Sequence, residues 1–229
     1  MPDAPREPAA PICDAAGFVL AGGQSTRMGR DKALLAFDRR PLIEHVLATL
    51  HEAGLSASIA GANPSVLASL AAFAPVVEDL EPGRGPLAGV CAALASTTAS
   101  YAVFLPVDLP LLPSSLIVYL LQHARITVHA VTVPSVNGFA ETFPAILHRS
   151  ILPALENELR SDRSGCFAAF QAAAAVFGQS ISILAVELLA QSGQVVYPLG
   201  LLPVHWFLNV NTPENLQHAE AVVARNRVS

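Results

Sequence analysis

Residues 18–32 run from an apolar stretch directly into a glycine loop that carries several cations. The apolar part predicts a buried strand, and the paired Gly22 and Gly23 let the backbone turn back sharply with positive φ. Such a turn brings backbone N–H groups close to a ligand, which suits phosphate oxygens. Arg27 and Lys32 add two full positive charges. We therefore expect this segment to cradle a nucleoside triphosphate.

Strand-like and helix-like patterns alternate from this loop to about residue 125. A helix is expected over 41–54, with Pro41 at its start and Gly54 at its end. Further strands are expected at 57–60, 76–77 and 101–105, and further helices from 65, over 87–95 and over 113–123. This alternation predicts right-handed βαβ units. We expect an α/β, Rossmann-like fold with a mostly parallel central sheet and helices on both faces.

Three positions of chemical interest directly follow expected strands. They are Gly22, Asp79 and Asp108. In open parallel sheets, ligands bind beyond the carboxyl ends of the strands. The topology therefore predicts that these three distant segments converge on one crevice.

The remainder of the chain is less regular. It predicts strands at 130–133, 140–145 and 206–211, and helices from Ser150, from Cys166 and from Pro213, the last capped by Thr212. The segment 178–203 is ambiguous, because 181–189 fits either a strand or an amphipathic helix.

The chain length of 229 residues and its even composition favour one domain. Residues 1–15, rich in proline and alanine, lack the apolar core of a signal peptide and are expected to form a disordered tail. A single domain is expected over 16–229. Its nucleotide-binding half would span about 16–125 and its acceptor half about 126–229.

Composition excludes several classes of protein. Hydrophobic residues make up 52% of the chain, but charged residues, glycines and prolines interrupt the apolar windows, so no membrane span is expected. A net charge of −5 argues against a nucleic-acid surface and favours a small anionic ligand. The three cysteines, odd in number and without C-x-x-C spacing, predict neither disulfides nor zinc and fit a reducing cytoplasm.

Asp108 is the best candidate for a metal ligand. It follows a buried strand, and Mg²⁺ prefers one or two carboxylates together with phosphate oxygens and water. An alternative is that Asp108 only caps a helix after Pro110. Asn209 and Asn211, two residues apart, would share one side of a strand, although asparagines are also ordinary turn and cap residues.

The glycine loop closely resembles the signature L-A-G-G-x-S-x-R-M-G-x-D-K of the molybdenum cofactor guanylyltransferases, a branch of the nucleotidyltransferases. Residues 209–213 resemble the N-V-N-T-P motif of the same family, and 78–79 with 85–89 also match it. The resemblance is strong over 17–112 and 205–220. It makes a phosphate-binding role more plausible than a tight turn with solvated cations, and it implies the nucleotidyltransferase fold.

The resemblance also implies roles for individual residues. Lys32, Arg27 and Asp108 would act in catalysis, and Asp108, Asn209 and Asn211 would hold Mg²⁺. Contacts to GTP would come from Leu20, Ala21, Gly22, Gly23, Lys32, Gly61, Asp79, Gly85 and Asp108. Known members carry an asparagine where this chain has Gly61, and Asn63 lies two residues further on.

Two features favour guanine as the base. The carboxylate of Asp79 can accept hydrogen bonds from both N1–H and the exocyclic N2–H of guanine, a pair that adenine and cytosine lack. Members that use CTP tend to have alanine at the second glycine of the loop, where this chain has Gly23.

The expected function is Mg²⁺-dependent transfer of GMP from GTP to the terminal phosphate of molybdopterin, which gives molybdopterin guanine dinucleotide and pyrophosphate. Protein partners would be molybdenum-insertion proteins and molybdoenzyme chaperones, with no nucleic acid or membrane. Transfer of a cytidylyl group, or to a sugar phosphate, is an alternative. A nucleotide-binding regulator on the same fold is another.

Overall fold

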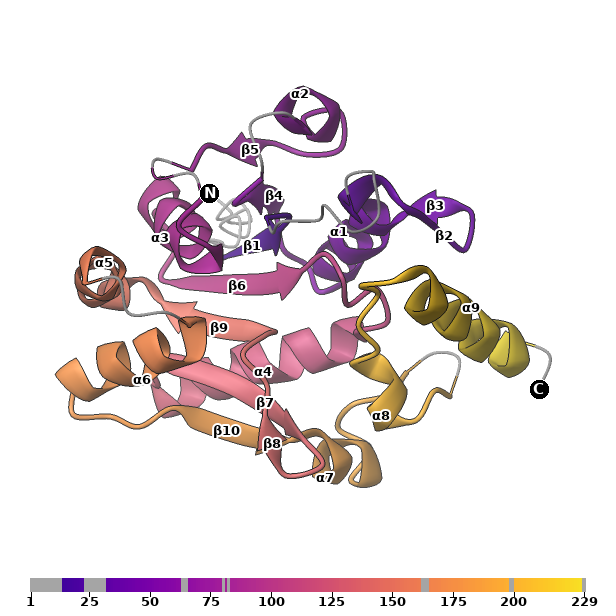
Figure 1. The fold of residues 1–229 in the computed structure, drawn as a ribbon. Helices are drawn as coiled ribbons and strands as arrows, with labels where there is room; N and C mark the ends of the chain where they lie inside the picture. The colour runs from indigo at the N-terminus through magenta and orange to yellow at the C-terminus, as the bar shows by residue number, and fades with distance from the viewer. Residues whose placement is uncertain are drawn as a thin grey trace, which may run out of the picture.

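The computed structural model describes residues 14–22, 32–62, 66–79, 81, 83–161, 165–197 and 200–227. Within these ranges the chain forms one eight-stranded sheet and a small hairpin (Figure 1). The strand order along the sheet is β10-β7-β9-β6-β1-β4-β5, and β8 pairs with β7. The strands are β1 (Ala15–Leu20), β4 (Ala57–Ala60), β5 (Val76–Val77), β6 (Tyr101–Pro106), β7 (Val131–Val136), β8 (Phe139–Ala140), β9 (Ala145–His148) and β10 (Ser182–Ala185).

Most of the sheet is parallel, which confirms the predicted fold class. Strand β1 pairs in parallel with β4 and with β6, β4 pairs in parallel with β5, and β10 pairs in parallel with β7. Strand β9 runs antiparallel to both β6 and β7, and β8 runs antiparallel to β7. The carboxyl ends of β1, β4, β5, β6 and β7 therefore lie at one edge.

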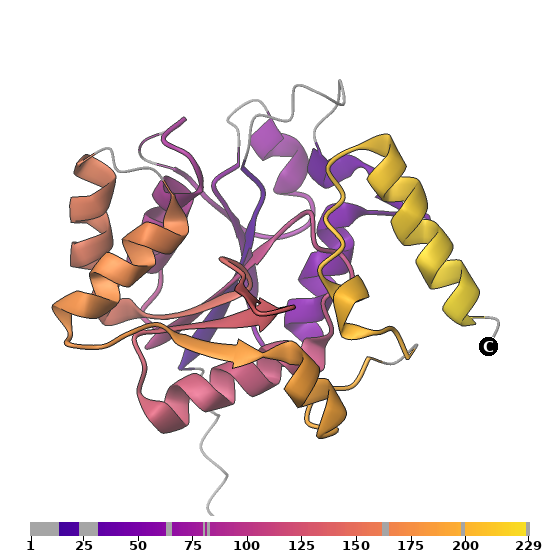
Figure 2. The same ribbon diagram turned by 60° about the horizontal axis from the view of Figure 1, so that its bottom comes forward.

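Helices cover both faces of the sheet (Figure 2). One face packs against α3 (Pro86–Ser96), α5 (Leu152–Arg160) and α6 (Cys166–Val176). The other packs against α1 (Leu42–Glu52), α4 (Ser114–Thr127), α7 (Val186–Gln191), α8 (Pro203–Trp206) and α9 (Pro213–Arg227). Short helices α2 (Leu67–Leu70), η2 (Lys32–Leu34) and η4 (Arg149–Ile151) complete the described part. None of its helices is long and apolar enough to cross a membrane.

Strand β6 shows how the sequence builds two cores at once. Successive side chains of a strand point to opposite faces. Accordingly Val103 and Leu105 pack with α1 and α4, whereas Phe104 packs with α3, α5 and α6. The Phe104 ring stacks on Phe18 of β1 with 5.5 Å between centroids. A strand that is covered on both faces of the sheet exposes no side chains to water. This explains why residues 101–105 form an unbroken apolar run.

Several predicted elements have different bounds in the structure. Residues 140–145 are not one strand but the end of β8 and the start of β9, because 141–144 leave the sheet between them. The ambiguous segment 181–189 is a strand followed by a helix, β10 and then α7. Strand β1 begins at Ala15, inside the expected tail, whose first 13 residues lie outside the described ranges.

The predicted strand at 206–211 was wrong. Helix α8 ends at Trp206, and 207–211 pair with no strand of the described sheet. Pro203 at the first turn favours this short helix. The buried indole N–H of Trp206 donates to the Leu201 carbonyl at 2.8 Å, which holds the turn.

Three glycines bring separate backbones into direct contact near the carboxyl ends of β1 and β4. A Cβ on Gly22 would lie 2.0 Å from the Gly61 carbonyl oxygen, and a Cβ on Gly89 would lie 2.7 Å from the Gly61 Cα. Gly61 itself has φ of +68°. Because the neighbouring atoms are backbone, no side-chain movement can make room. The loop after β1, the end of β4 and helix α3 therefore depend on glycine to approach one another.

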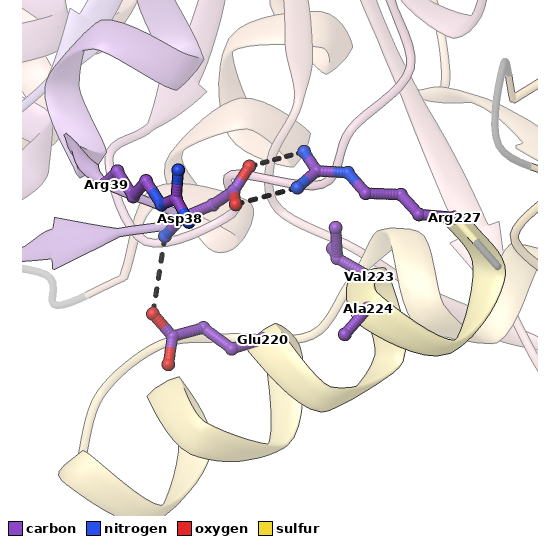
Figure 3. Close-up of a pocket in the computed structure, with 6 residues that line it drawn as sticks. All are labelled: Asp38, Arg39, Glu220, Val223, Ala224 and Arg227. Carbon is purple, nitrogen blue, oxygen red and sulfur yellow. Dashed lines mark hydrogen bonds and ion pairs between the residues drawn. The ribbon is translucent and has the colours of Figure 1, made fainter.

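A hairpin links the first third of the chain to its last helix. Strands β2 (Ala36–Phe37) and β3 (Arg40–Pro41) are joined by Asp38 and Arg39, both with positive φ, as two-residue hairpin turns require. The Asp38 carboxylate accepts two hydrogen bonds from Arg227, at 2.9 and 2.5 Å, and the Asp38 N–H donates to Glu220 at 3.3 Å (Figure 3). These contacts border a shallow cavity of about 250 Å³.

Gly89→Ala tests the glycine contact. Alanine is favoured over glycine inside a helix by up to about 1 kcal/mol, yet the clash with Gly61 should make this variant about 1–3 kcal/mol less stable. Urea unfolding measures the difference. Ala95→Gly, at an exposed position of the same helix, calibrates the propensity effect, and a stabilised Gly89→Ala would contradict the contact.

The Asp38–Arg227 pair predicts a pH-dependent coupling. The hydrogen bond from Arg227 lowers the pKa of Asp38 below 3.8. A carboxyl whose pKa is lowered by folding stabilises the folded state above its unfolded pKa and loses this effect as pH falls through the folded one. A double-mutant cycle of Asp38→Asn and Arg227→Gln should give a small favourable coupling at pH 7 that begins to fall near pH 3.8 and is lost only below the lowered pKa of Asp38. Strict additivity at pH 7 would rule the pair out as a stabilising contact.

Candidate active site

The loops after the central parallel strands leave the sheet at the same edge. Hydrogen bonds continue the strand pairing past the strand ends, from Ala21 N–H to the Ala60 carbonyl (3.0 Å) and from Val107 N–H to the Leu20 carbonyl (3.1 Å). Gly22 and Asp108 follow these residues directly. The ends of β1, β4 and β6 therefore lie together, which places Gly22 and Asp108 at the same edge of the sheet, as predicted for these two segments.

Asp108 sits in a turn that points its carboxylate away from the core. The Leu109 N–H donates to the Pro106 carbonyl at 3.3 Å, and the flanking Val107 and Leu109 are buried. The side chain of Asp108 keeps 20% of its surface exposed. It does not cap a helix, since α4 begins only at Ser114. The alternative role as a helix cap is thus excluded.

In the described part of the chain, Lys32 is the only basic residue whose side chain contacts the Asp108 carboxylate. Its Nζ donates to Asp108 Oδ2 at 2.7 Å and also to Asn211 Oδ1. Its side chain is 15% exposed. The adjacent Ala33 is completely buried, which anchors the short helix that carries Lys32. The ion pair is therefore partly shielded from water, where charges interact more strongly than at an open surface.

Residues 209–211 reach the site without being part of a strand. The Val210 N–H donates to the Asp108 carbonyl at 2.9 Å, and the Val210 side chain is fully buried while Asn209 and Asn211 are exposed on either side of it. The alternation expected for a strand survives, but it is held by one backbone bond. Thr212 accepts from the Asn215 N–H at 3.2 Å, which confirms it as the cap of α9.

The oxygens of Asp108 and Asn211 fit a divalent metal. Both converge on a single cation, the Lys32 ammonium, and carboxylate and amide oxygens are ligands that Mg²⁺ accepts. Asn209 lies next to them, without a side-chain bond to either. In the described ranges no three His, Cys, Asp or Glu side chains gather around one point. A metal here would need further oxygens from a ligand such as a phosphate.

Asp79 lies beyond the carboxyl end of β5, the strand at the far edge of the parallel part of the sheet. It follows β5, and its Oδ1 accepts a hydrogen bond from the Glu81 N–H at 3.0 Å. Gly85, with φ of +77°, turns the chain into the first residue of α3. Strands β4 and β1 separate β5 from β6, so the strands that precede Asp79 and Asp108 are about 14 Å apart in the plane of the sheet. The structure does not bring these two carboxylates together.

The remaining predicted nucleotide contacts fall into two groups. Leu20 and Ala21 are buried at the end of β1, so only their backbone can face a ligand, and Gly61 is held in the glycine contact. Gly23, Arg27 and Asn63 lie outside the described residues. The close contact of Gly89 with Gly61 was not predicted from the sequence. A glycine within a helical pattern can indicate such a contact. The bond between Lys32 and Asn211, 179 residues apart, had no local signal.

Comparison with known proteins identifies the family of the chain. Residues 17–176 match the family model described as the MobA-like NTP transferase domain. A molybdenum cofactor guanylyltransferase of Xanthomonas euvesicatoria is 42% identical over 48% of this chain, a match that spans about half, 54%, of that relative. A probable molybdenum cofactor guanylyltransferase of Bacillus mycoides is 28% identical over 90% of this chain and 95% of its own length.

A solved structure extends the likeness to the whole fold. The molybdopterin-guanine dinucleotide biosynthesis protein A of Archaeoglobus fulgidus superposes with a TM-score of 0.74 at 21% identity, over 92% of this chain and 99% of that one. The family expected from the glycine loop is thus confirmed. The chain belongs to the MobA-like NTP transferases, within the molybdenum cofactor guanylyltransferase family, and is a nucleotidyltransferase.

Proposed function

We propose that the protein transfers GMP from GTP to the terminal phosphate of molybdopterin, which forms molybdopterin guanine dinucleotide and releases pyrophosphate. The observation that carries the proposal is the cluster of Lys32, Asp108 and Asn211 at the edge of the sheet where β1 and β6 end. It combines a cation for phosphates with oxygens for a metal at the edge where such folds bind nucleotides. Relatives named guanylyltransferases support the same activity.

The separation of the polar groups supports an extended nucleotide. Phosphates beside Gly22 and Lys32 would leave the base near β5 and the start of α3, where Asp79 lies. A carboxylate can accept from guanine N1–H and N2–H together. Asp79 is the residue that we expect to select guanine. Gly85 would let the backbone pass close to the nucleoside.

The reaction needs little covalent chemistry from the protein. An oxygen of the molybdopterin phosphate attacks the α-phosphorus of GTP, the bond from that phosphorus to the α–β bridging oxygen breaks, and pyrophosphate leaves. Lys32 would neutralise the charge that develops on the leaving group, and we expect Arg27 to assist. Asp108, Asn211 and Asn209 would hold Mg²⁺, which would supply further charge neutralisation when bound.

The acceptor would enter from the side of β7 and β9. Residues 141–144 leave the sheet between β8 and β9, on the side of β7 that faces β6. Glu141 lies there, and its N–H donates to the Pro134 carbonyl at 2.9 Å. Burial raises the pKa of Glu141. This loop belongs to the acceptor half, and we expect molybdopterin to bind near it.

The two described cysteines bear on where in the cell we expect the protein to act. Cys91 and Cys166 are buried and free, which suits a reducing cytoplasm. Proteins that insert molybdenum or chaperone molybdoenzymes would hand over the acceptor and receive the product.

A nucleotide panel tests the proposal directly. GTP, CTP, ATP and UTP are each incubated with Mg²⁺ and molybdopterin, and pyrophosphate release and dinucleotide formation are measured. Product with GTP alone is expected. Product mainly with CTP would favour the cytidylyl alternative, and nucleotide binding without product would favour a regulator.

Asp108→Ala should reduce turnover at least about a hundredfold, because it removes a preorganised charge from the reacting phosphates. The melting temperature should fall far less than turnover does, because Lys32 keeps its bond to Asn211 when the carboxylate is removed. Asp14→Asn, which removes an exposed carboxylate at the opposite edge of the sheet, is the matched control. Normal turnover at saturating Mg²⁺ would remove Asp108 from the mechanism.

Asp79→Asn should weaken GTP binding by about 1–3 kcal/mol, because the amide presents a donor to a guanine N–H. ITP, which lacks the 2-amino group, should bind the wild type more weakly than GTP does, and the variant should no longer discriminate between them. Calorimetry measures all four affinities. Glu78→Gln, at the exposed preceding residue, is the control, and unchanged discrimination in Asp79→Asn would show that another group reads the base.

A further inference from the structure

Lys32 is the only lysine in the chain, whose other strongly basic side chains are all arginines. Its ammonium is bonded to the two oxygens, on Asp108 and Asn211, that best fit a divalent metal. One position in the fold therefore offers the same oxygens to two different cations.

The backbone segments that carry the two oxygens are held together without help from the lysine. A backbone bond from Val210 N–H to the Asp108 carbonyl, at 2.9 Å, ties the segments that carry Asp108 and Asn211. The turn at 106–109 and the buried Val210 side chain fix both segments further. Removal of the ammonium would therefore leave Asp108 and Asn211 on backbone segments that stay side by side.

The ammonium and a divalent metal cannot both occupy this position. A lone pair that accepts a hydrogen bond from Lys32 is not available for a metal, and two cations a few ångströms apart repel each other. A lysine can make way because its charge is compact and its stem is flexible. The planar, five-donor guanidinium of an arginine would bind the carboxylate in a different, forked geometry.

We propose that Lys32 is a built-in competitor of the metal. It occupies the Asp108 and Asn211 oxygens, and it moves to the phosphates when a metal–nucleotide complex binds. Before the exchange Lys32 is paired with Asp108. Afterwards the metal is paired with Asp108 and Lys32 with a phosphate, so no charge is left unpaired. Metal and nucleotide should then each strengthen the binding of the other by the same factor. Only this nucleotide part rests on the proposed function.

The first test measures Mn²⁺ binding by the intact protein without nucleotide, using the electron paramagnetic resonance signal of free Mn²⁺. Lys32→Met keeps most of the stem and removes the charge. It should bind Mn²⁺ about ten- to a hundredfold more tightly than the wild type, because two charge-assisted hydrogen bonds no longer compete. A lysine that only held nucleotide would leave this affinity unchanged.

Two further variants make the result specific to the site. Arg149→Met removes the same charge beyond the amino end of β6, and it should leave Mn²⁺ affinity within about twofold of the wild type. Adding Asp108→Asn to Lys32→Met should abolish the gain. Unchanged or weaker binding by Lys32→Met, an equal gain in Arg149→Met, or a gain that survives Asp108→Asn would each overturn the proposal.

The single lysine also permits a direct observation in the wild-type protein. Labelling with ¹³C-lysine gives one Cε resonance. Saturating Mg²⁺ alone should shift it toward the position of a free lysine, and Mg²⁺ with a non-hydrolysable GTP analogue should move it to a third position. A resonance that does not respond to Mg²⁺ would refute the competition. A response to Mg²⁺ without one to the GTP analogue would refute the nucleotide exchange and count against GTP as the ligand, while the metal part stands.

Discussion

Strand β1 pairs in parallel along both of its edges, with β4 and with β6, and this arrangement determines where the polar groups of the site lie. Because parallel strands all end on one side, the residues that follow each of them meet there. The glycine contact then lets the backbones come closer than side chains would allow. Gly61 is at its centre, against Gly22 on one side and Gly89 on the other. The start of the glycine loop, for which we propose phosphate binding, and helix α3 are thereby placed next to each other.

The electrostatics of the site depend on one partly shielded cation. Lys32 and Asp108 are both mostly covered, so separating them without a replacement partner would be costly. A metal that takes the carboxylate and a phosphate that takes the ammonium can do so together at lower cost. Our proposals on activity and on metal competition thus describe the same exchange of partners. Family membership indicates nucleotidyl transfer. The Lys32–Asp108 pair gives a physical reason why the metal and the nucleotide that we propose as ligands should bind together.

The last third of the chain completes a site whose other residues come from the first half. Asn211 precedes α9, and the far end of α9 is held by the bonds from Arg227 to Asp38. Asp38 belongs to the hairpin that follows Lys32 by a few residues (Figure 3). The hairpin and the helix therefore connect the two segments that contribute Lys32 and Asn211. The position of each is fixed by contacts more than 170 residues away in sequence.

The fold class, most helices of the first half and the family of the glycine loop could be predicted from the sequence alone. These depend on local patterns: strand and helix periods, prolines at helix starts, and glycines where the backbone has to turn. The prediction failed at 206–211, because the buried Trp206 and its bond to Leu201 outweigh the strand-like pattern. The bonds from Lys32 to Asp108 and Asn211, and the fit of Gly89 against Gly61, became visible only in the folded chain. Both are contacts between distant segments, and no local pattern encodes the distance between two groups that only folding brings together.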